Sequence, residues 1–508
     1  MPVDPRPDPV RLVILVTLAV SALGLYRFAS PDHAIDDAWI SFRIARTALQ
    51  TGHLTYDATQ PPVEGMTNLL WTVLSMLWVG LPVDPIGPAR CLGAVFHLAT
   101  VAMLTRSAAD VAARLGGSAV PAACVTGVLL ATSGTLAFNA MSGLETSLYG
   151  LLLALAFGCA LAGQCATAGV CLGLLAATRP EGVLVGGLAV GILLAGGPGR
   201  GAALRMVVPF GLLVGGVEVF RFGYYGAFVP NTYYAKPPDL HQGLAYVAGA
   251  LAWGTGAIGL TGILPVARRS RAAMVTAACM GLLVAGTAWS GGDWMPGARR
   301  LTDVLLAGAT LTGVSAGLLA GAGGRQLALF SLPILAWVGG NVLSAMLGHD
   351  SASYEHEDMA RLGQAVADNP QIRTVALSDI GRFGWTFPRS IYDLDGLTDA
   401  HIGRMAGKRG EKSWDEAYFR ARAVDLVLLP CESLVTDPLT TPLSVEVGNT
   451  PLLLSILDHG GYRYHGEVGL SPGHWLLVFG RDGLALDPST FGPESKRDLR
   501  DILADAAR

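Results

Sequence analysis

The sequence predicts an α-helical polytopic membrane protein that carries a C-terminal extracytoplasmic α/β domain. Hydrophobic residues make up 51% of the 508 positions and charged residues only 15%, whereas a typical soluble protein has roughly 25% charged residues. Apolar stretches recur as far as about residue 345, and beyond them the chain turns polar. The net charge of −4 is too small to indicate nucleic acid as a partner.

Apolar stretches of roughly 17–25 residues, the length that spans a bilayer as a helix, predict about eleven transmembrane helices. They lie at about 10–28, 88–105, 119–138, 145–162, 166–181, 183–197, 203–220, 243–262, 272–289, 301–320 and 327–346, the fifth and sixth being short. The first follows Arg6 and Arg11 and lacks a small-residue cleavage site. It is therefore predicted to be a retained anchor and not a signal peptide.

The apolar stretch 69–83 decides the predicted topology, because it can be counted as a span or as an interfacial or re-entrant helix. The second choice places the arginine clusters on the cytoplasmic side, as the positive-inside rule requires. These arginines are Arg106, Arg114, Arg200, Arg205, Arg268, Arg269, Arg271 and Arg325. We therefore expect a multi-pass protein of the cytoplasmic (inner) membrane with its N-terminus inside and its C-terminal domain outside.

Two domains are predicted, a transmembrane domain at 1–348 and an extracytoplasmic α/β domain at 349–508. The second domain shows amphipathic helix patterns near 354–368, 413–422 and 449–458, and strand-like runs at 372–378, 424–429 and 474–480. Short apolar strands that alternate with helices predict a partly parallel sheet.

Two adjacent carboxylates, Asp36 and Asp37, directly follow the first predicted span and precede Trp39. They could be solvated loop charges. Their position at the membrane exit also suits a general base that takes a proton from an acceptor hydroxyl, or a ligand of a divalent cation. Adjacent like charges raise one pKa, which suits a base. We expect this pair to carry catalysis, with Asp36 preferred over Asp37, and the residues alone do not decide whether a metal is bound.

Four cations fall on the predicted outer face, against the usual inside bias. They are Arg179, Lys236, Arg299 and Arg300. Cations that converge beside apolar helices predict an anionic partner at the membrane interface, and a lipid phosphate is the natural one.

Single carboxylates also occur in the outer loops at Glu64, Glu145 and Asp293. Glu64 precedes Thr67 and Asn68, which could cap the helix that follows, and Glu145 and Asp293 could cap helix ends themselves. Asp293 is the better candidate for a functional role because Gly291 and Gly292 precede it. In the C-terminal region, Asp379 follows a predicted strand, where a sugar or acceptor contact and a structural turn are both open.

The motifs and their order along the chain resemble those of the polytopic glycosyltransferases of the C superfamily (GT-C), most of all the branch of the mycobacterial terminal β-arabinofuranosyltransferase. The stretches that carry the resemblance are 36–43 (DDAWISFR), 63–71 (VEGMTNLLW), 143–146 (GLET), 179–182 (RPEG), 230–236 (PNTYYAK), 292–296 (GDWMP), 379–381 (DIG) and 393–399 (DLDGLTD). They cover most of the chain. Trp39 stands where tyrosine is usual.

The resemblance implies a polyprenyl-phosphate-linked sugar donor, used outside the membrane, with arabinofuranose as a candidate sugar. The acceptor would be a cell-envelope glycan, a lipid or a protein, and the C-terminal domain would bind the acceptor or a glycan. Asp36 or Asp37 would be the catalytic carboxylate. The residues implied to contact substrate are Glu64, Glu145, Asn231, Tyr233, Asp293, Trp294 and Asp379.

A polytopic transporter or lipid flippase is the alternative from another class. It would require charged residues in the middle of the membrane and symmetry between the two halves of the chain. Both are scarce in this sequence. A third alternative is an enzyme-like fold kept as a scaffold or glycan receptor.

Overall fold

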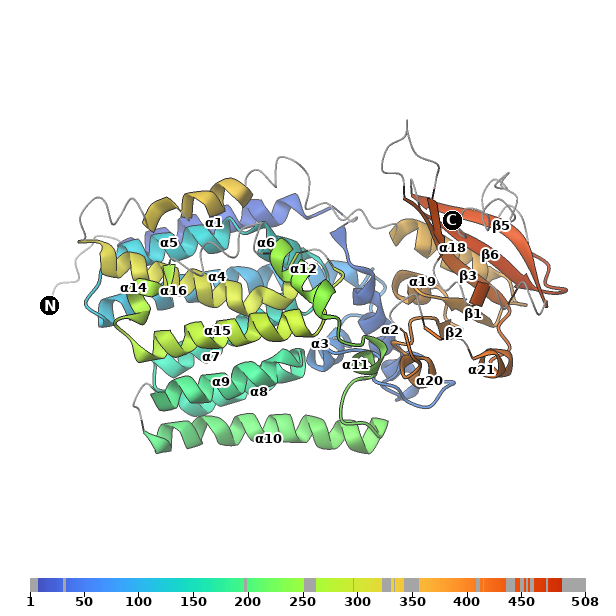
Figure 1. Cartoon of the computed structure of the whole chain (residues 1–508), viewed down its shortest axis with the longest axis horizontal. Coiled ribbons are helices and arrows are strands. Elements are labelled where there is room, and N and C mark those ends of the chain that lie inside the picture. The colour runs from blue at the N-terminus through green and yellow to red at the C-terminus, as the bar shows by residue number, and fades with distance from the viewer. Residues whose placement is uncertain are drawn as a thin grey trace.

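The computed structural model contains a long helical bundle and a smaller α/β domain beyond one end of it (Figure 1). It describes residues 8–30, 33–195, 199–250, 262–295, 297–321, 330–332, 334–341, 356–407, 412–413, 415–434, 444–447, 452–453, 456, 461–471 and 474–486.

Most helices of the bundle run along the long axis of the molecule (Figure 1). Among the described residues, five helices are long and apolar enough to cross a membrane. They are α1 (Pro9–Arg27), α4 (Ile86–Arg114), α10 (Arg200–Tyr225), α15 (Arg271–Trp289) and the run of η3 (Arg299–Leu301) with α16 (Thr302–Leu319). These match the predicted spans at those positions.

Other predicted spans appear as bent or shorter helices. A bend of 54° separates α5 (Ala119–Ala131) from α6 (Gly134–Met141), which together pass the same test as one broken span. Three shorter apolar helices follow, α7 (Thr146–Leu161), α8 (Cys165–Thr178) and α9 (Glu181–Ala195). The later elements are α12 (Leu240–Ala250) and α14 (Leu264–Ala267), and the predicted spans at 243–262 and 327–346 lie partly outside the described residues.

Three helices connect the bundle to the α/β domain, α2 (Asp36–Thr51), α3 (Leu69–Ser75) and α11 (Asn231–Ala235) (Figure 1). The stretch expected to be interfacial contains α3, whose seven residues rise only about 10 Å and cannot span a hydrocarbon layer of about 30 Å. Its next residues form turns.

The α/β domain is built on a mixed sheet of order β2-β1-β3-β6-β5, with β4 paired to β3. Its strands are β1 (Thr374–Leu377), β2 (Ser390–Asp393), β3 (Leu426–Leu434), β4 (Ser444–Val447), β5 (Tyr462–Ser471) and β6 (His474–Arg481). Its helices are α18 (His356–Asp368), α19 (Ile380–Thr386), α20 (Ala400–Gly403) and α21 (Glu416–Ala421).

The pairings confirm the predicted partly parallel sheet, since β1 pairs in parallel with β2 and β3, while β3, β5 and β6 pair antiparallel. The sequence predicted β1, β3 and β6 but not β2, β4 or β5. Of the predicted helix at 449–458, only residues 452, 453 and 456 are described.

One apolar cluster joins the two parts of the molecule. It combines Ile40 and Ile44 of α2 with Phe383 of α19 and with Val375 and Leu428 of the sheet. These side chains are almost fully buried, and burial of such side chains is the main favourable contribution to folding. The first loop of the membrane part is therefore packed into the core of the α/β domain.

Candidate functional site

The two adjacent aspartates of α2 point to different neighbours. Both oxygens of the buried Asp36 carboxylate accept backbone hydrogen bonds from the start of α19, from Gly381 N at 2.8 Å and from Arg382 N at 2.7 Å. Burial, followed by the negative charge of Asp379, raises the pKa of Asp36 to about 7. Asp36 is thus engaged by the α/β domain.

Asp37 lies about 100° further round the same helix. Its side chain is half-buried, and within the described part of the chain its carboxylate accepts no hydrogen bond. Its charge interacts with that of Arg299. Asp37 is therefore a carboxylate with unused acceptor capacity that lies near the cations.

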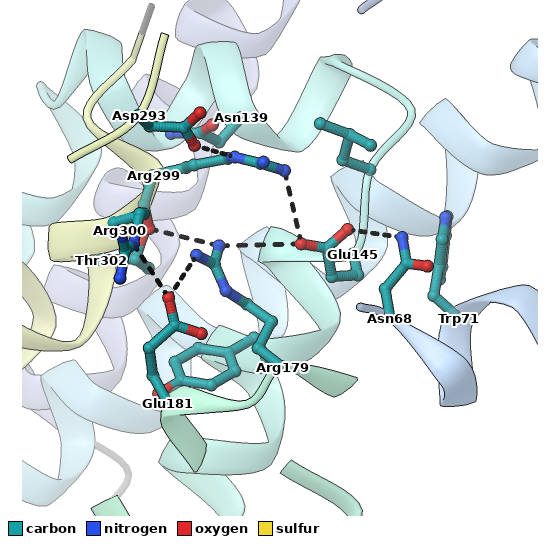
Figure 2. A network of polar contacts seen from close by, with 12 residues as sticks. Asn68, Trp71, Asn139, Glu145, Arg179, Glu181, Asp293, Arg299, Arg300 and Thr302 are labelled. Carbon is teal, nitrogen blue, oxygen red and sulfur yellow. Dashed lines mark hydrogen bonds and ion pairs between the residues drawn. The ribbon is translucent and has the colours of Figure 1, made fainter. Parts of the chain in front are cut away.

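Glu145 lies between two arginines in a buried polar network at this end of the bundle (Figure 2). Its Oε1 is 3.7 Å from Arg179 Nη1 and 3.6 Å from Arg299 Nη1. Its Oε2 accepts a 2.9 Å hydrogen bond from Asn68 Nδ2. Glu145 occupies the N-cap position of α7, but its side chain makes no capping bond.

The network continues to a third arginine through a second carboxylate (Figure 2). Glu181 Oε1 accepts from Arg179 Nη2 at 3.2 Å and from Arg300 Nε at 3.1 Å. Arg300 also donates to the carbonyl of Gly292 at 2.8 Å. Three of the four predicted cations therefore share one cluster, although Arg179 lies 120 positions before Arg299 and the adjacent Arg300 in the sequence.

Asp293 links the fourth cation to this network. Arg299 Nε donates to its carboxylate at 2.5 Å. Burial alone would raise the pKa of Asp293, but the positive charges of Arg299 and Lys236 outweigh it and hold that pKa below the usual range. Lys236 itself is exposed. All four predicted cations thus lie near one another, and Lys236 is the one at the surface.

Glu64 and Asn231 are engaged elsewhere. Arg221 donates to both oxygens of Glu64, at 2.6 and 3.1 Å, and it also pairs with Glu218. Asn231 Nδ2 donates to the carbonyls of Gly396, Leu397 and Asp399 in the α/β domain, at 2.8–3.1 Å.

The remaining predicted contacts are spread over three places. Tyr233 is exposed, Trp294 packs against the main apolar cluster of the bundle, and Asp379 precedes α19 as its N-cap residue without a side-chain capping bond. The assignment of these residues, and of Glu64 and Asn231, to substrate stays a prediction.

Two important polar residues were not predicted as site residues, Asn68 and Glu181. Asn68 is the N-cap residue of α3, yet its side chain makes no capping bond there. Its Oδ1 instead accepts from Ser41 and Thr72 while its Nδ2 donates to Glu145. The sequence signal was their place in the motifs at 63–71 and 179–182, where each is a polar residue beside an apolar helix.

The described residues contain no group of three or more His, Cys, Asp and Glu side chains that could hold a metal ion. The arrangement that the structure does show is a set of cations beside one unengaged carboxylate. Chemically, such a set can hold an anion and accept a proton from a neighbouring hydroxyl.

Solved structures define the class of this fold. ArnT from Cupriavidus metallidurans bound to undecaprenyl phosphate matches with a TM-score of 0.56 at 13% identity, over 96% of this chain and 99% of that chain. The apo oligosaccharyltransferase of Archaeoglobus fulgidus matches with a TM-score of 0.54 at 12% identity, over 89% and 79%. The chain therefore has the fold of these proteins, which is the polytopic helical GT-C fold that the sequence predicted.

A third solved structure with a similar fold is that of the arabinofuranosyltransferase AftD from Mycobacteria. It matches with a TM-score of 0.50 at 17% identity, over 92% of this chain but only 41% of AftD. A family described as a domain of unknown function (DUF8728) matches residues 349–480. No curated protein sequence matches the chain significantly.

Proposed function

We propose that the protein is a membrane glycosyltransferase that moves a sugar from a polyprenyl-phosphate donor to a cell-envelope glycan, lipid or protein. The observation that carries this proposal is the cluster of Arg179, Arg299 and Arg300 beside the unengaged Asp37. The GT-C fold supports it, because ArnT with that fold binds undecaprenyl phosphate. The chemistry would take place at the outer face of the inner membrane, where the domain from residue 349 on would bind the acceptor or a glycan.

The cations would hold the donor phosphate. Their charges are balanced by Glu145, Glu181 and Asp293, so their positions are fixed before any ligand arrives. Preorganised charges stabilise a developing anion without reorganising during the reaction. Lys236, which is exposed at the edge of the cluster, would make the first contact with the phosphate.

Asp37 would be the catalytic carboxylate, in preference to Asp36. It would take the proton of the acceptor hydroxyl while the hydroxyl oxygen bonds to the anomeric carbon. The bond from that carbon to the phosphate oxygen breaks, and polyprenyl phosphate leaves with the electron pair. Asp36 is a poorer candidate because both of its oxygens already accept hydrogen bonds.

Arabinofuranose is the sugar to test first, because the motifs and the AftD likeness agree on it. The full chain in detergent is incubated with radiolabelled polyprenyl-phosphate arabinofuranose and an arabinan oligosaccharide, and with other polyprenyl-phosphate sugars in parallel. Labelled oligosaccharide and free polyprenyl phosphate should form together. Asp37→Asn should lower kcat by about 10²–10⁴-fold. Asp110→Asn, at an exposed carboxylate paired with Arg106, is the matched control and should leave the rate unchanged.

Transfer at the normal rate by Asp37→Asn would remove Asp37 from catalysis. If no donor yields product, but the chain moves the lipid between leaflets of a vesicle, the flippase alternative is correct.

A further inference from the structure

The start of α2, the helix that carries Asp37, is bound to the start of α19 in the α/β domain. Asp36, the first residue of α2, accepts hydrogen bonds from the backbone N–H groups of Gly381 and Arg382. These two N–H groups are among those that a helix leaves without an internal partner at its first turn. The Asp36 side chain supplies the acceptor oxygens that these groups lack.

The middle of α2 is bound to the other end of α19. The buried Arg43 donates to the carbonyls of Gly384, Phe387 and Arg389 at 2.7, 2.9 and 2.7 Å. Arg46 donates to the carbonyl of Trp385 at 2.7 Å. Carbonyls at the end of a helix lack internal partners and carry its negative dipole, so cations are favourable there. One end of α19 thus meets hydrogen-bond acceptors from α2, and the other end meets donors.

Two glycines allow the helices to come this close. A Cβ atom added to Gly381 would collide with the backbone oxygen and carboxylate of Asp36. One added to Gly384 would collide with the Tyr56 hydroxyl, which donates to the carbonyl of Ile380 at 2.5 Å. The two glycines of the Asp-x-Gly-x-x-Gly run at 379–384 are therefore explained by these close contacts.

Another face of α2 carries the reactive group. Asp37 and Ser41 lie four residues apart on this face. Ser41 donates to Asn68 at 3.1 Å, and Asn68 donates to Glu145, which lies between Arg179 and Arg299. The α/β domain thus contacts one face of α2, while the network of Asn68, Glu145 and the arginines contacts the other.

We infer that Asp36, Arg43 and Arg46 form an interdomain clamp with α19 that positions Asp37 against the acceptor hydroxyl. Asp36, Arg43 and Arg46 are positioning residues, and the α/β domain helps to shape the active site in addition to binding the acceptor. This inference rests on the proposed function. A general base must lie within hydrogen-bond reach of the proton that it takes, and a small misplacement of a reacting group lowers the rate steeply.

The test measures single-turnover transfer by the full chain with Arg43→Lys, Arg46→Lys and Asp36→Asn, each with and without Asp37→Asn. Lysine keeps the charge but cannot donate to three carbonyls in the fixed geometry of a guanidinium. Arg43→Lys should lower kcat by about 10- to 100-fold and leave the donor KM within about twofold. Arg46 is only partly buried, so Arg46→Lys should fold even if Arg43→Lys does not. Arg420→Lys, on the exposed side of the same domain, is the control and should be silent.

The decisive readout is the dependence on Asp37, because residues that act through one group are not additive with its loss. In the Asp37→Asn background, the clamp variants should lower the rate by less than about twofold. Equal fold-losses in both backgrounds, a rise in donor KM at unchanged kcat, or no loss at all would overturn the clamp. Transfer that is absent already in the wild-type protein would refute the proposed function, and the clamp with it.

Discussion

Glu145→Gln should destabilise the protein and make it more responsive to its lipid ligand. The carboxylate lies 3.7 and 3.6 Å from Arg179 and Arg299, and all three side chains are largely buried. One such pair interacts by about 4 kcal/mol at an effective dielectric constant near 20. Removal of one partner of a buried ion pair costs about 3–5 kcal/mol, since the other charge is left uncompensated. Glutamine keeps an oxygen for Asn68, so the lost charge is the main change.

Thermal unfolding of the purified protein in detergent, with and without polyprenyl phosphate, measures both effects. The variant should unfold at a lower Tm than the wild-type protein. The added lipid should raise its Tm by more than it raises the wild-type Tm, because the phosphate replaces the missing negative charge between the arginines. Glu416→Gln removes a carboxylate from an exposed pair with Arg420 and should cost no more than about 1 kcal/mol. An unchanged Tm, or a lipid response no greater than that of the wild-type protein, would show that Glu145 does not balance the charges of the two arginines.

Three further predictions concern the edges of the site. Lys236→Ala should raise the donor KM about tenfold at unchanged kcat, which corresponds to a loss of roughly 1.4 kcal/mol of binding free energy. Lys236→Arg should restore the wild-type KM. Steady-state kinetics that show an unchanged KM for Lys236→Ala would exclude Lys236 from donor binding. Asn231→Ala removes the hydrogen-bond donor of three buried carbonyls and should lower the free energy of unfolding by about 1–3 kcal/mol. Amide hydrogen exchange at residues 396–399 should become faster. Unaltered exchange would contradict this prediction. Because the pKa of Asp36 is raised from 3.8 to about 7, the folded state holds a proton that the unfolded chain releases, so stability should fall as pH rises from about 4 to about 7. The measurement is Tm as a function of pH, and Tm should fall less over this range in Asp36→Asn than in the wild-type protein. Equal falls in the two proteins would show that Asp36 does not cause the pH dependence.

Much of the fold could be predicted because its signals are local. A run of apolar residues identifies a membrane helix wherever it packs, and the alternation of short apolar strands with helices predicted the mixed sheet. Strands β2, β4 and β5 were missed because their runs are short or polar, as in Tyr462–Ser471, and are completed by pairing with distant strands.

Composition and spacing along the chain were enough to predict the fold class, the polar residues just outside the membrane helices and the order of their motifs. The contacts of each polar residue, in contrast, could be read only from the folded structure. Asp36 and Asp37 are neighbours in sequence, yet one binds backbone groups some 345 positions away while the charge of the other interacts with that of Arg299. Glu64 and Glu145 look alike as single carboxylates, but one pairs with Arg221 and the other joins the arginine cluster. Ion pairs and hydrogen bonds act over a few ångströms in space, and their partners come together only when the helices and the α/β domain pack.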